Sequence, residues 1–345
     1  MSGIVLSQNE RMYVQVTHPY AAEAPNSTGT ATVANGDYVP HIKLELPGFG
    51  GEVITSNAKT GALGRLRGIE GRSGSQPWRM EIPFQMSGAA GTPPDMDPIL
   101  EAIFGQAGTD TADTSVAYAL SDAVPGLTIW SYRTVGGSAT NVAQRCAWGS
   151  LLDEFEITTS EGELVLRCSG PTGFALPSIG FSSFSTEQKG GLSAFPSEPA
   201  SPAATGNIIA GFLGSLSING VSSFLVESFS VRGRLGRTLR YAFGDRVPIV
   251  PIAAKREISC SFRIFEENVS AVNTMRDLQR SKTPVDINLV YGEVAGYIAT
   301  FALNGVVLAS EQLDDSGPEY VLGMSDNPAS MTNATTKDEL ALTLT

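Results

Sequence analysis

The stretch Trp78-Arg-Met-Glu-Ile-Pro-Phe-Gln-Met86 carries an apolar residue at every second position. The alternation puts Trp78, Met80, Ile82, Phe84 and Met86 on one face and the other residues on the opposite face, which is typical of a half-buried β-strand. Because proline cannot donate a hydrogen bond to a neighbouring strand, Pro83 predicts a sheet edge or a bulge at that point. A sheet buried on one face is therefore the expected basis of the fold.

A short helix is predicted to follow this strand. Asp97 suits the N-cap, Pro98 the first helical position and Gly105 the end of the helix. The region from Gly105 to Pro125 is rich in Thr, Ala and Asp and is predicted to be a loop. Next come a predicted strand over 127–134 and a hairpin over 154–168, whose turn lies at 159–162.

The second half of the chain shows the same order of signals. Apolar residues alternate again from Ile258 to Ile264. Asn268 is placed to cap a helix with apolar residues at positions 269, 272, 275 and 278. A strand is predicted over 285–291 and a hairpin over 306–322.

This order suggests an internal duplication. Residues 148–166 align on residues 304–322 without a gap over 19 positions, of which six are identical, including Gly149 with Gly305 and Leu166 with Leu322. Pairing Ile82 with Ile258 requires 20 more residues of separation, which the longer loop after the first helix would absorb. The alternative is that two β-rich halves share an order of elements without common descent.

The predicted fold is mainly β, a β-rich α+β class of two tandem antiparallel sandwich or barrel domains with one short flanking helix each. The first domain is expected to span residues 1–170 and the second 208–345, with a Gly-, Pro- and Ser-rich linker or arm at 171–207. A long hairpin is expected at 18–41, and its length predicts a contact with a neighbouring subunit. The residues chosen for that contact are Ala22, Asn26, Thr30, Asn35 and Asp37.

Composition narrows the possible functions. Of 345 residues, 42% are hydrophobic and only 17% charged, while 37 Gly and 20 Pro follow no collagen-like period. The formal net charge of −12, from 23 basic and 35 acidic residues, opposes binding to a phosphate backbone. Three widely spaced cysteines argue against a disulfide framework or a zinc site, and neither a signal peptide nor a membrane span is expected.

No catalytic, cofactor or metal motif emerges from the sequence. The two histidines, His18 and His41, lie beside prolines in or near the predicted hairpin, and the Gly-rich run 61–68 lacks phosphate-loop spacing. Acidic clusters near the hairpin turns could serve acid–base chemistry or Ca²⁺, but solvated strand faces explain them as well. The acidic candidates for an interface are Asp153, Glu154, Glu156, Glu161, Glu163, Asp314 and Asp315.

Basic residues cluster at two places that align loosely between the halves. The clusters contain Arg65, Arg67, Arg72 and Arg79 in the first half, and Arg232, Arg234, Arg237, Arg240 and Arg246 in the second. Acidic faces and basic stripes on one unit predict complementary surfaces for head-to-tail assembly, although scattered surface charge is an alternative.

The segment Trp78–Gly105, in which a strand leads through a small-residue loop and a Pro/Asp signal into a short helix, resembles the tail tube proteins of long-tailed bacteriophages. The hairpin over 154–173 is similar to the family's next strand pair, and the segment 217–229 resembles the opening of a tube domain. The resemblance covers most of the chain in element order and rests on short motifs.

The resemblance implies a virion structural protein, made in the host bacterial cytoplasm, whose rings stack into a hollow tube. With two domains per chain the ring is expected to be a trimer of pseudo-sixfold symmetry or a hexamer. The expected partners are other copies, the tape-measure, tail-terminator and tail-tip proteins, and phage DNA that passes an acidic lumen without specific binding.

Two other classes are weighed against this one. A tail-tip or adhesin-like module that binds a carbohydrate or receptor would expose aromatic residues on loops, whereas Trp78, Trp130 and Trp148 lie in strand-like contexts. A β-rich hydrolase would need two carboxylates that converge in a cleft. No enzymatic activity and no cofactor are expected.

Overall fold

The computed structural model describes residues 5–17, 32–47, 53–54, 69–70, 77–135, 138–160, 162–177, 196–199, 206–209, 214–222, 224–241, 243, 248, 250–266, 269–314, 320–332, 335 and 337–345. The protein is mainly β, as the sequence predicted, and its paired strands are antiparallel.

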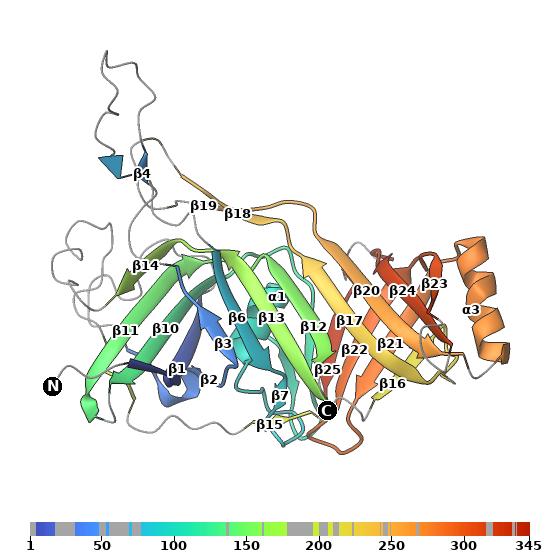
Figure 1. The fold of residues 1–345 in the computed structure, drawn as a ribbon, viewed down its shortest axis with the longest axis horizontal. Coiled ribbons are helices and arrows are strands. Elements are labelled where there is room, and N and C mark those ends of the chain that lie inside the picture. The colour runs from blue at the N-terminus through green and yellow to red at the C-terminus, as the bar shows by residue number, and fades with distance from the viewer. Residues whose placement is uncertain are drawn as a thin grey trace, which may run out of the picture.

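An eight-stranded sheet extends across the molecule (Figure 1). Its strands, in spatial order, are β23 (Glu311–Asp314), β24 (Val321–Pro328), β20 (Glu257–Phe265), β17 (Val226–Arg234), β12 (Glu154–Ser160), β13 (Glu163–Pro171), β6 (Pro77–Pro83) and β3 (Lys43–Glu45). The pairing of β12 with β17 joins strands from the two halves of the chain into one sheet.

Two further sheets complete the core. One contains, in order, β14 (Phe174–Pro177), β11 (Ser138–Ser150), β10 (Gly126–Val135), β1 (Val5–Thr17) and β2 (Tyr38–Val39). The other contains β16 (Gly214–Ile218), β21 (Val285–Tyr291), β22 (Ala299–Val306), β25 (Ala341–Leu344), β9 (Ser115–Ala119) and β8 (Thr109–Thr111). Both lie behind the eight-stranded sheet in Figure 1.

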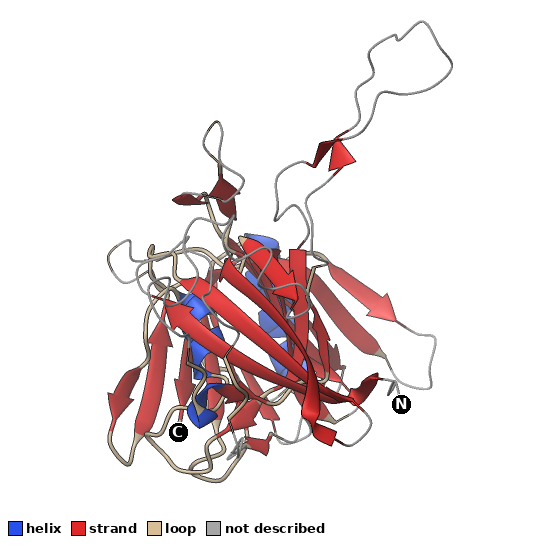
Figure 2. Cartoon of the chain, turned by 90° about the vertical axis from the view of Figure 1, so that its left-hand side faces the viewer, coloured by secondary structure: helices blue, strands red, loops and turns tan. Residues whose placement is uncertain are grey.

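Smaller elements surround these layers. Three two-stranded pairs are formed by β15 (Asn207–Ile208) with β7 (Gln85–Met86), β18 (Arg237–Arg240) with β19 (Val250–Ala253), and β4 (Val53–Ile54) with β5 (Ile69–Glu70). The described helices are α1 (Asp97–Phe104), α3 (Val269–Ser281) and the 3-10 turn η1 (Asn35–Asp37). Figure 2 shows that strands predominate over the few helical turns and that ribbons project beyond the sheets.

The predicted alternation places the core. Trp78, Ile82 and Phe84 are fully buried, and the exposed Arg79 lies on the other face of β6. The prediction of a sheet edge or a bulge at Pro83 is wrong, because β6 lies between β13 and β3 and pairs with β13 without a register shift. Pro83 is instead the last residue of β6, so its missing donor falls where the strand ends. The predicted helices and the strand Val285–Tyr291 are also present, and Val272 and Met275 of α3 are buried as their spacing indicated.

The two halves share one strand order. In the eight-stranded sheet, β3-β6-β13-β12 of the first half corresponds to β17-β20-β24-β23 of the second. Behind it, β1-β10-β11-β14 corresponds to β16-β21-β22-β25. The aligned glycines Gly149 and Gly305 have φ of 57° and 58°, a left-handed conformation that favours glycine, at the ends of β11 and β22.

Several details differ from the sequence predictions. Asp97 is the first residue of α1 and Met96 holds the N-cap position, because the turn before the helix closes one residue earlier than expected. The predicted loop 105–125 contains the hairpin β8–β9, which pairs with β25 of the second half. The predicted linker at 171–207 contains β14, which pairs with β11.

The strand register also corrects one repeat assignment. Leu166 lies opposite Ile82, whereas its aligned counterpart Leu322 lies opposite Ile264. By sheet position the counterpart of Ile82 is therefore Ile264 and not Ile258. The sequence alone could not choose between them, because both residues belong to the same alternating apolar face of β20.

Candidate functional site

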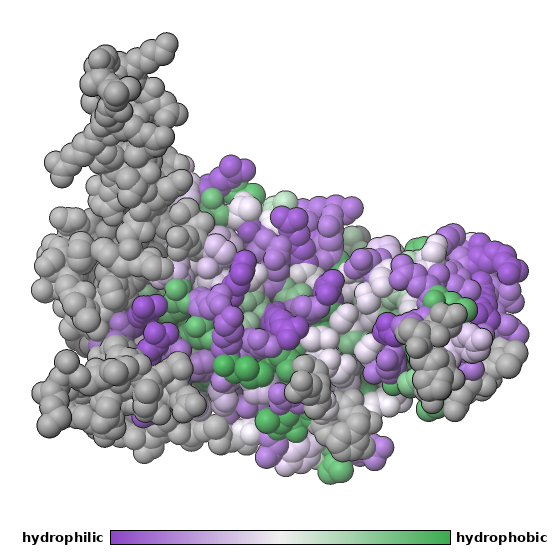
Figure 3. Space-filling model, in the orientation of Figure 1, coloured by the Kyte–Doolittle hydropathy of each residue, from purple (hydrophilic) through white to green (hydrophobic). Residues whose placement is uncertain are grey.

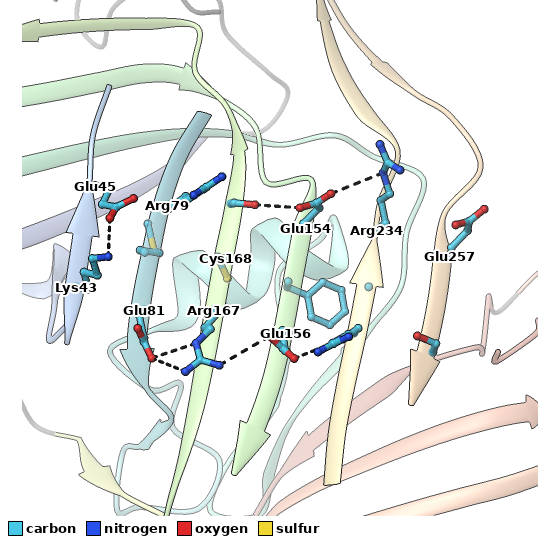
Figure 4. Close-up of a pocket in the computed structure, with 16 residues that line it drawn as sticks. Lys43, Glu45, Arg79, Glu81, Glu154, Glu156, Arg167, Cys168, Arg234 and Glu257 are labelled. Atoms are coloured by element: carbon cyan, nitrogen blue, oxygen red, sulfur yellow. Dashed lines mark hydrogen bonds and ion pairs between the residues drawn. The ribbon is translucent and has the colours of Figure 1, made fainter. Parts of the chain in front are cut away.

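A shallow groove of about 600 Å³ lies on the face of the eight-stranded sheet that points away from the core. It crosses β3, β6, β13, β12, β17 and β20 and therefore spans the junction between the two halves (Figure 4). Hydrophilic side chains gather over these strands on the surface (Figure 3).

Strand alternation explains why charged side chains meet there. In β12, Phe155 and Ile157 point into the core and are 3% and 4% exposed, so Glu154 and Glu156 point outward. Because directly paired residues of antiparallel strands point to the same side, register determines which charges become neighbours.

The first row of charges follows one line of paired residues across five strands. Lys43 is paired with Glu81, Glu81 with Arg167, Arg167 with Glu156, and Glu156 with Arg232. The signs alternate from β3 to β17. The Arg167 guanidinium donates to Glu81 at 2.9 Å and lies 3.9 Å from Glu156, while Arg232 Nε donates to Glu156 at 2.7 Å.

The second row lies two residues away from the first on each strand and runs through Glu45, Arg79, Ser169, Glu154 and Arg234. Arg234 lies 3.9 Å from Glu154, and the Ser169 hydroxyl donates to Glu154 at 3.4 Å. Within β3, Lys43 lies 2.6 Å from Glu45 and lowers the pKa of that carboxyl. Glu257 of β20, paired with Arg234, ends the row.

Two more arginines continue the pattern toward α3. Arg263 of β20 bridges Glu227 at 2.6 Å and Asp314 at 2.9 Å, and both carboxylates raise its pKa. Arg276 of α3 similarly bridges Glu311 and Glu266, each at 3.0 Å. The arginines of this half of the sheet thus also have carboxylate partners.

The acidic candidates fall into different environments. Glu154 and Glu156 lie in the groove, Glu163 begins β13 on the same face, and Asp314 pairs with Arg263. Asp153 instead accepts a hydrogen bond from the backbone amide of Arg237 at 2.6 Å. Glu161 and Asp315 lie outside the described residues. The prediction of an acidic sheet face needs correction, because arginines from neighbouring strands balance Glu154 and Glu156.

The basic clusters also separate. Arg79, Arg232 and Arg234 line the groove and Arg240 is exposed, but Arg237 is only 4% exposed. The Arg237 guanidinium donates to backbone carbonyls of Ala102 and Ile103 in α1, and of Leu152 and Ala123. The prediction that Arg237 is a surface charge is therefore wrong. Arg65, Arg67, Arg72 and Arg246 lie outside the described residues.

The predicted assembly hairpin is described only in part. Asn35 and Asp37 form η1, and the Asp37 carboxylate accepts hydrogen bonds from Gln15 Nε2 at 2.7 Å and Ala34 N at 2.8 Å. This end of the hairpin is held against β1 of its own chain. Ala22, Asn26 and Thr30, and His18 beside them, lie outside the described residues.

Other reactive or ligand-binding groups are buried. All three tryptophans are at most 2% exposed, and Trp78 Nε1 donates to the Leu151 carbonyl at 3.0 Å. Burial also raises the thiol pKa values of Cys146, Cys168 and Cys260 above the ordinary range. The described residues therefore offer no exposed tryptophan platform for a sugar and no activated thiol.

Comparison of the sequence with protein-family models and with curated proteins gave no match. Within the described ranges, no helix is both long and apolar enough to cross a membrane. The same ranges hold no group of three or more His, Cys, Asp or Glu side chains arranged to bind a metal ion.

Proposed function

We propose that this chain is a virion structural protein that assembles into stacked rings and forms the hollow tail tube of a long-tailed bacteriophage. The observation that carries the proposal is the β12–β17 junction, where the last strand of one four-strand unit pairs with the first strand of the next. The equal strand order of the halves further supports an internal duplication.

The same junction can repeat between chains. The outer strands of the sheet are β3, the counterpart of β17, and β23, the counterpart of β12. Among the described residues, no strand pairs with the outer edge of either one. A head-to-tail contact of β23 with β3 of the next copy would extend the sheet, and such contacts close into rings when the rotation allows.

Side chains at both edges support this contact. Ile42, beside β3, is 52% exposed and Leu313 of β23 is 56% exposed, although Leu313 pairs with the fully buried Leu322 and shares its core-facing side. Exposed strand edges with apolar residues favour pairing with another chain. Three such chains would provide six four-strand units, which fits a trimeric ring of pseudo-sixfold symmetry; a hexamer is the other possibility.

Stacking of rings is supported by the ribbons β4–β5 and β18–β19. They occupy equivalent places in the two halves, between β3 and β6 and between β17 and β20, and both project beyond the same end of the sheet (Figures 1 and 2). A two-stranded ribbon is marginally stable alone, and Val250 and Ile252 of β19 are 51% and 41% exposed. Contact with the next ring would stabilise it. The hairpin at 18–41, which is expected to contact a neighbouring subunit, would be a second stacking element.

The test is electron microscopy and light scattering of the purified chain. We expect rings or hollow tubes from the wild type and folded, unassembled chains from Ile42→Lys/Leu313→Lys, because lysine at a strand edge opposes pairing. Ile208→Lys/Val294→Lys, at sites that are also more than half exposed, is the matched control and should assemble normally. A wild type that stays monomeric at high concentration, or an edge variant that assembles like the control, contradicts the proposal.

A further inference from the structure

The charge of the groove differs from that of the whole chain. Five cationic and five anionic side chains line it, so its formal charge is zero, whereas the chain carries −12. The groove holds five of the 23 basic residues of this acidic protein, and four of these five are arginines, the side chain best suited to bind phosphate. The cations are Lys43, Arg79, Arg167, Arg232 and Arg234, and the anions are Glu45, Glu81, Glu154, Glu156 and Glu257.

Carboxylates accept hydrogen bonds from several of the donors that a phosphate would need. Arg167 directs both Nε and Nη2 to Glu81, at 3.1 and 2.9 Å, and Arg232 directs Nε to Glu156. A phosphate oxygen could bind these groups only by displacing a carboxylate or by accepting its repulsion. The face thus carries the side chains of a polyanion-binding surface in a neutralised state.

These ion pairs contribute little to folding. The Arg167 and Arg232 side chains are 44% and 57% exposed, and exposed ion pairs typically stabilise a protein by about 0–1 kcal/mol each. A structural need for stability therefore does not account for the alternating rows. A surface requirement explains them better.

The proposed ring determines which way the groove face of the eight-stranded sheet points. If the sheet closes edge to edge, one of its faces must line the enclosed space. The other two sheets cover the opposite face, and these layers would fill the lumen if they pointed inward (Figure 1). The groove face is then the one that faces the lumen.

We propose that this face is a self-neutralised lining for a passing polyanion, duplex DNA, in which Glu81, Glu154 and Glu156 hold the arginines away from phosphate. The inference rests on the proposed tube function. At the described residues, the expected acidic lumen becomes a neutral one. DNA does not adhere to it because the arginines are paired with carboxylates.

The experiment measures binding of a short fluorescein-labelled DNA duplex to the full-length chain by fluorescence anisotropy at several salt concentrations. The variant Glu81→Gln/Glu154→Gln/Glu156→Gln leaves Arg167, Arg232 and Arg234 without these carboxylates. We expect it to bind at least about tenfold more tightly than the wild type at about 50 mM salt. Release of about three counterions should give a slope near −2.7 for log K against log salt.

Two controls separate the groove from net charge. Asp110→Asn/Asp277→Asn/Glu293→Gln removes three exposed carboxylates outside the groove and should bind no more DNA than the wild type. Adding Arg167→Gln, Arg232→Gln and Arg234→Gln to the groove variant should abolish the gained affinity. A circular-dichroism melt within a few degrees of wild type shows that each variant is folded, as the exposed pairs predict.

The outcomes are decisive for the face. Strong DNA binding by the wild type, or equal binding by the groove variant and its charge-matched control, overturns the proposal. Should the groove variant unfold, Glu156→Gln alone provides the comparison at Arg232, because it removes the carboxylate that Arg232 contacts while Arg167 still donates to Glu81. Ring formation is scored on the same wild-type samples by electron microscopy. A chain that never assembles refutes the tube and with it the lumen, whereas the affinity measurement separately decides whether the carboxylates neutralise the arginines of this face.

Discussion

We predict that the hydrogen bonds of Arg237 are the main polar contact that stabilises the packing of the two halves of the chain. Arg237 begins β18 in the second half, yet its guanidinium lies against the C-terminal turn of α1 in the first half. The last carbonyls of a helix lack partners within the helix. Those of Glu101 and Phe104 accept hydrogen bonds from the amides of Gly105 and Ser121, and Arg237 supplies the donors for Ala102 and Ile103.

The substitution Arg237→Met keeps much of the apolar stem and removes these donors. It leaves buried carbonyls at Ala102 and Leu152 without them, and each unsatisfied group costs about 1–3 kcal/mol. The longer contacts to Ile103 and Ala123, both at 3.5 Å, add little. Relief from desolvating the cation, which lowers its pKa to about 10, offsets part of the loss. We expect a decrease of about 3 kcal/mol in the free energy of unfolding.

The assay is urea unfolding followed by tryptophan fluorescence, since all three tryptophans are buried. Arg240→Met, in the same strand but exposed, is the matched control and should change stability by less than about 0.5 kcal/mol. Arg237→Lys should fall between the two, because a single ammonium can satisfy fewer of the carbonyls. If Arg237→Met has the same free energy of unfolding as the Arg240→Met control, the hydrogen bonds of Arg237 are not what holds α1 to the second half.

Two other predictions concern single residues. Burial raises the pKa of Asp97 to about 6, although the Tyr118 hydroxyl donates to its carboxylate at 2.5 Å. Because the pKa is higher in the folded state than in the unfolded state, this group favours folding at low pH, and its contribution is lost as the pH rises through about 6. Asp97→Asn should therefore be more stable than wild type by about 1–2 kcal/mol at pH 8 but not at pH 4, and a pH-independent difference in urea midpoint would refute this. Gly305→Ala should lower the free energy of unfolding by about 2 kcal/mol in the same assay, because a Cβ would lie 2.5 Å from the Ser330 carbonyl oxygen at a φ of 58°. Gly36→Ala, where nothing lies within 4 Å, is the control and should be neutral. Equal urea midpoints for the two variants would contradict the predicted strain at Gly305.

Local patterns were sufficient for several strands and for the helices, but not for the long strand β11. The alternation at Trp78–Met86 and at Ile258–Ile264 and the apolar spacing of the helix after Asn268 depend on neighbours within one element, so they could be read directly. The hairpin β8–β9 was missed for the opposite reason. Thr109–Thr111 is entirely exposed, and β9 is a strand because it pairs with β25, more than 200 residues later.

The candidate site shows the same division. The sequence indicated that Glu154 and Glu156 would share a face, but it could not supply their partners. Glu156 binds Arg232, which lies 76 residues further on, and only the register of β12 against β17 brings the two together. Arg237 looked like another surface charge in the same cluster. Its burial depends on the position of α1, which no pattern around residue 237 encodes.

The halves are joined more strongly to each other than the proposed ring contact would join separate chains. The β12–β17 ladder is one link between the halves. In addition, β8–β9 of the first half extends the six-stranded sheet by pairing with β25 of the second half, and Arg237 of the second half donates to α1 of the first half. Only three residues lie between α3 and β21, so the second half has no counterpart of β8–β9 to offer a neighbour. A ring built through β23 and β3 would therefore alternate strong and weak junctions. Such a ring would separate into intact two-unit chains, because the weaker junctions between β23 and β3 would open first.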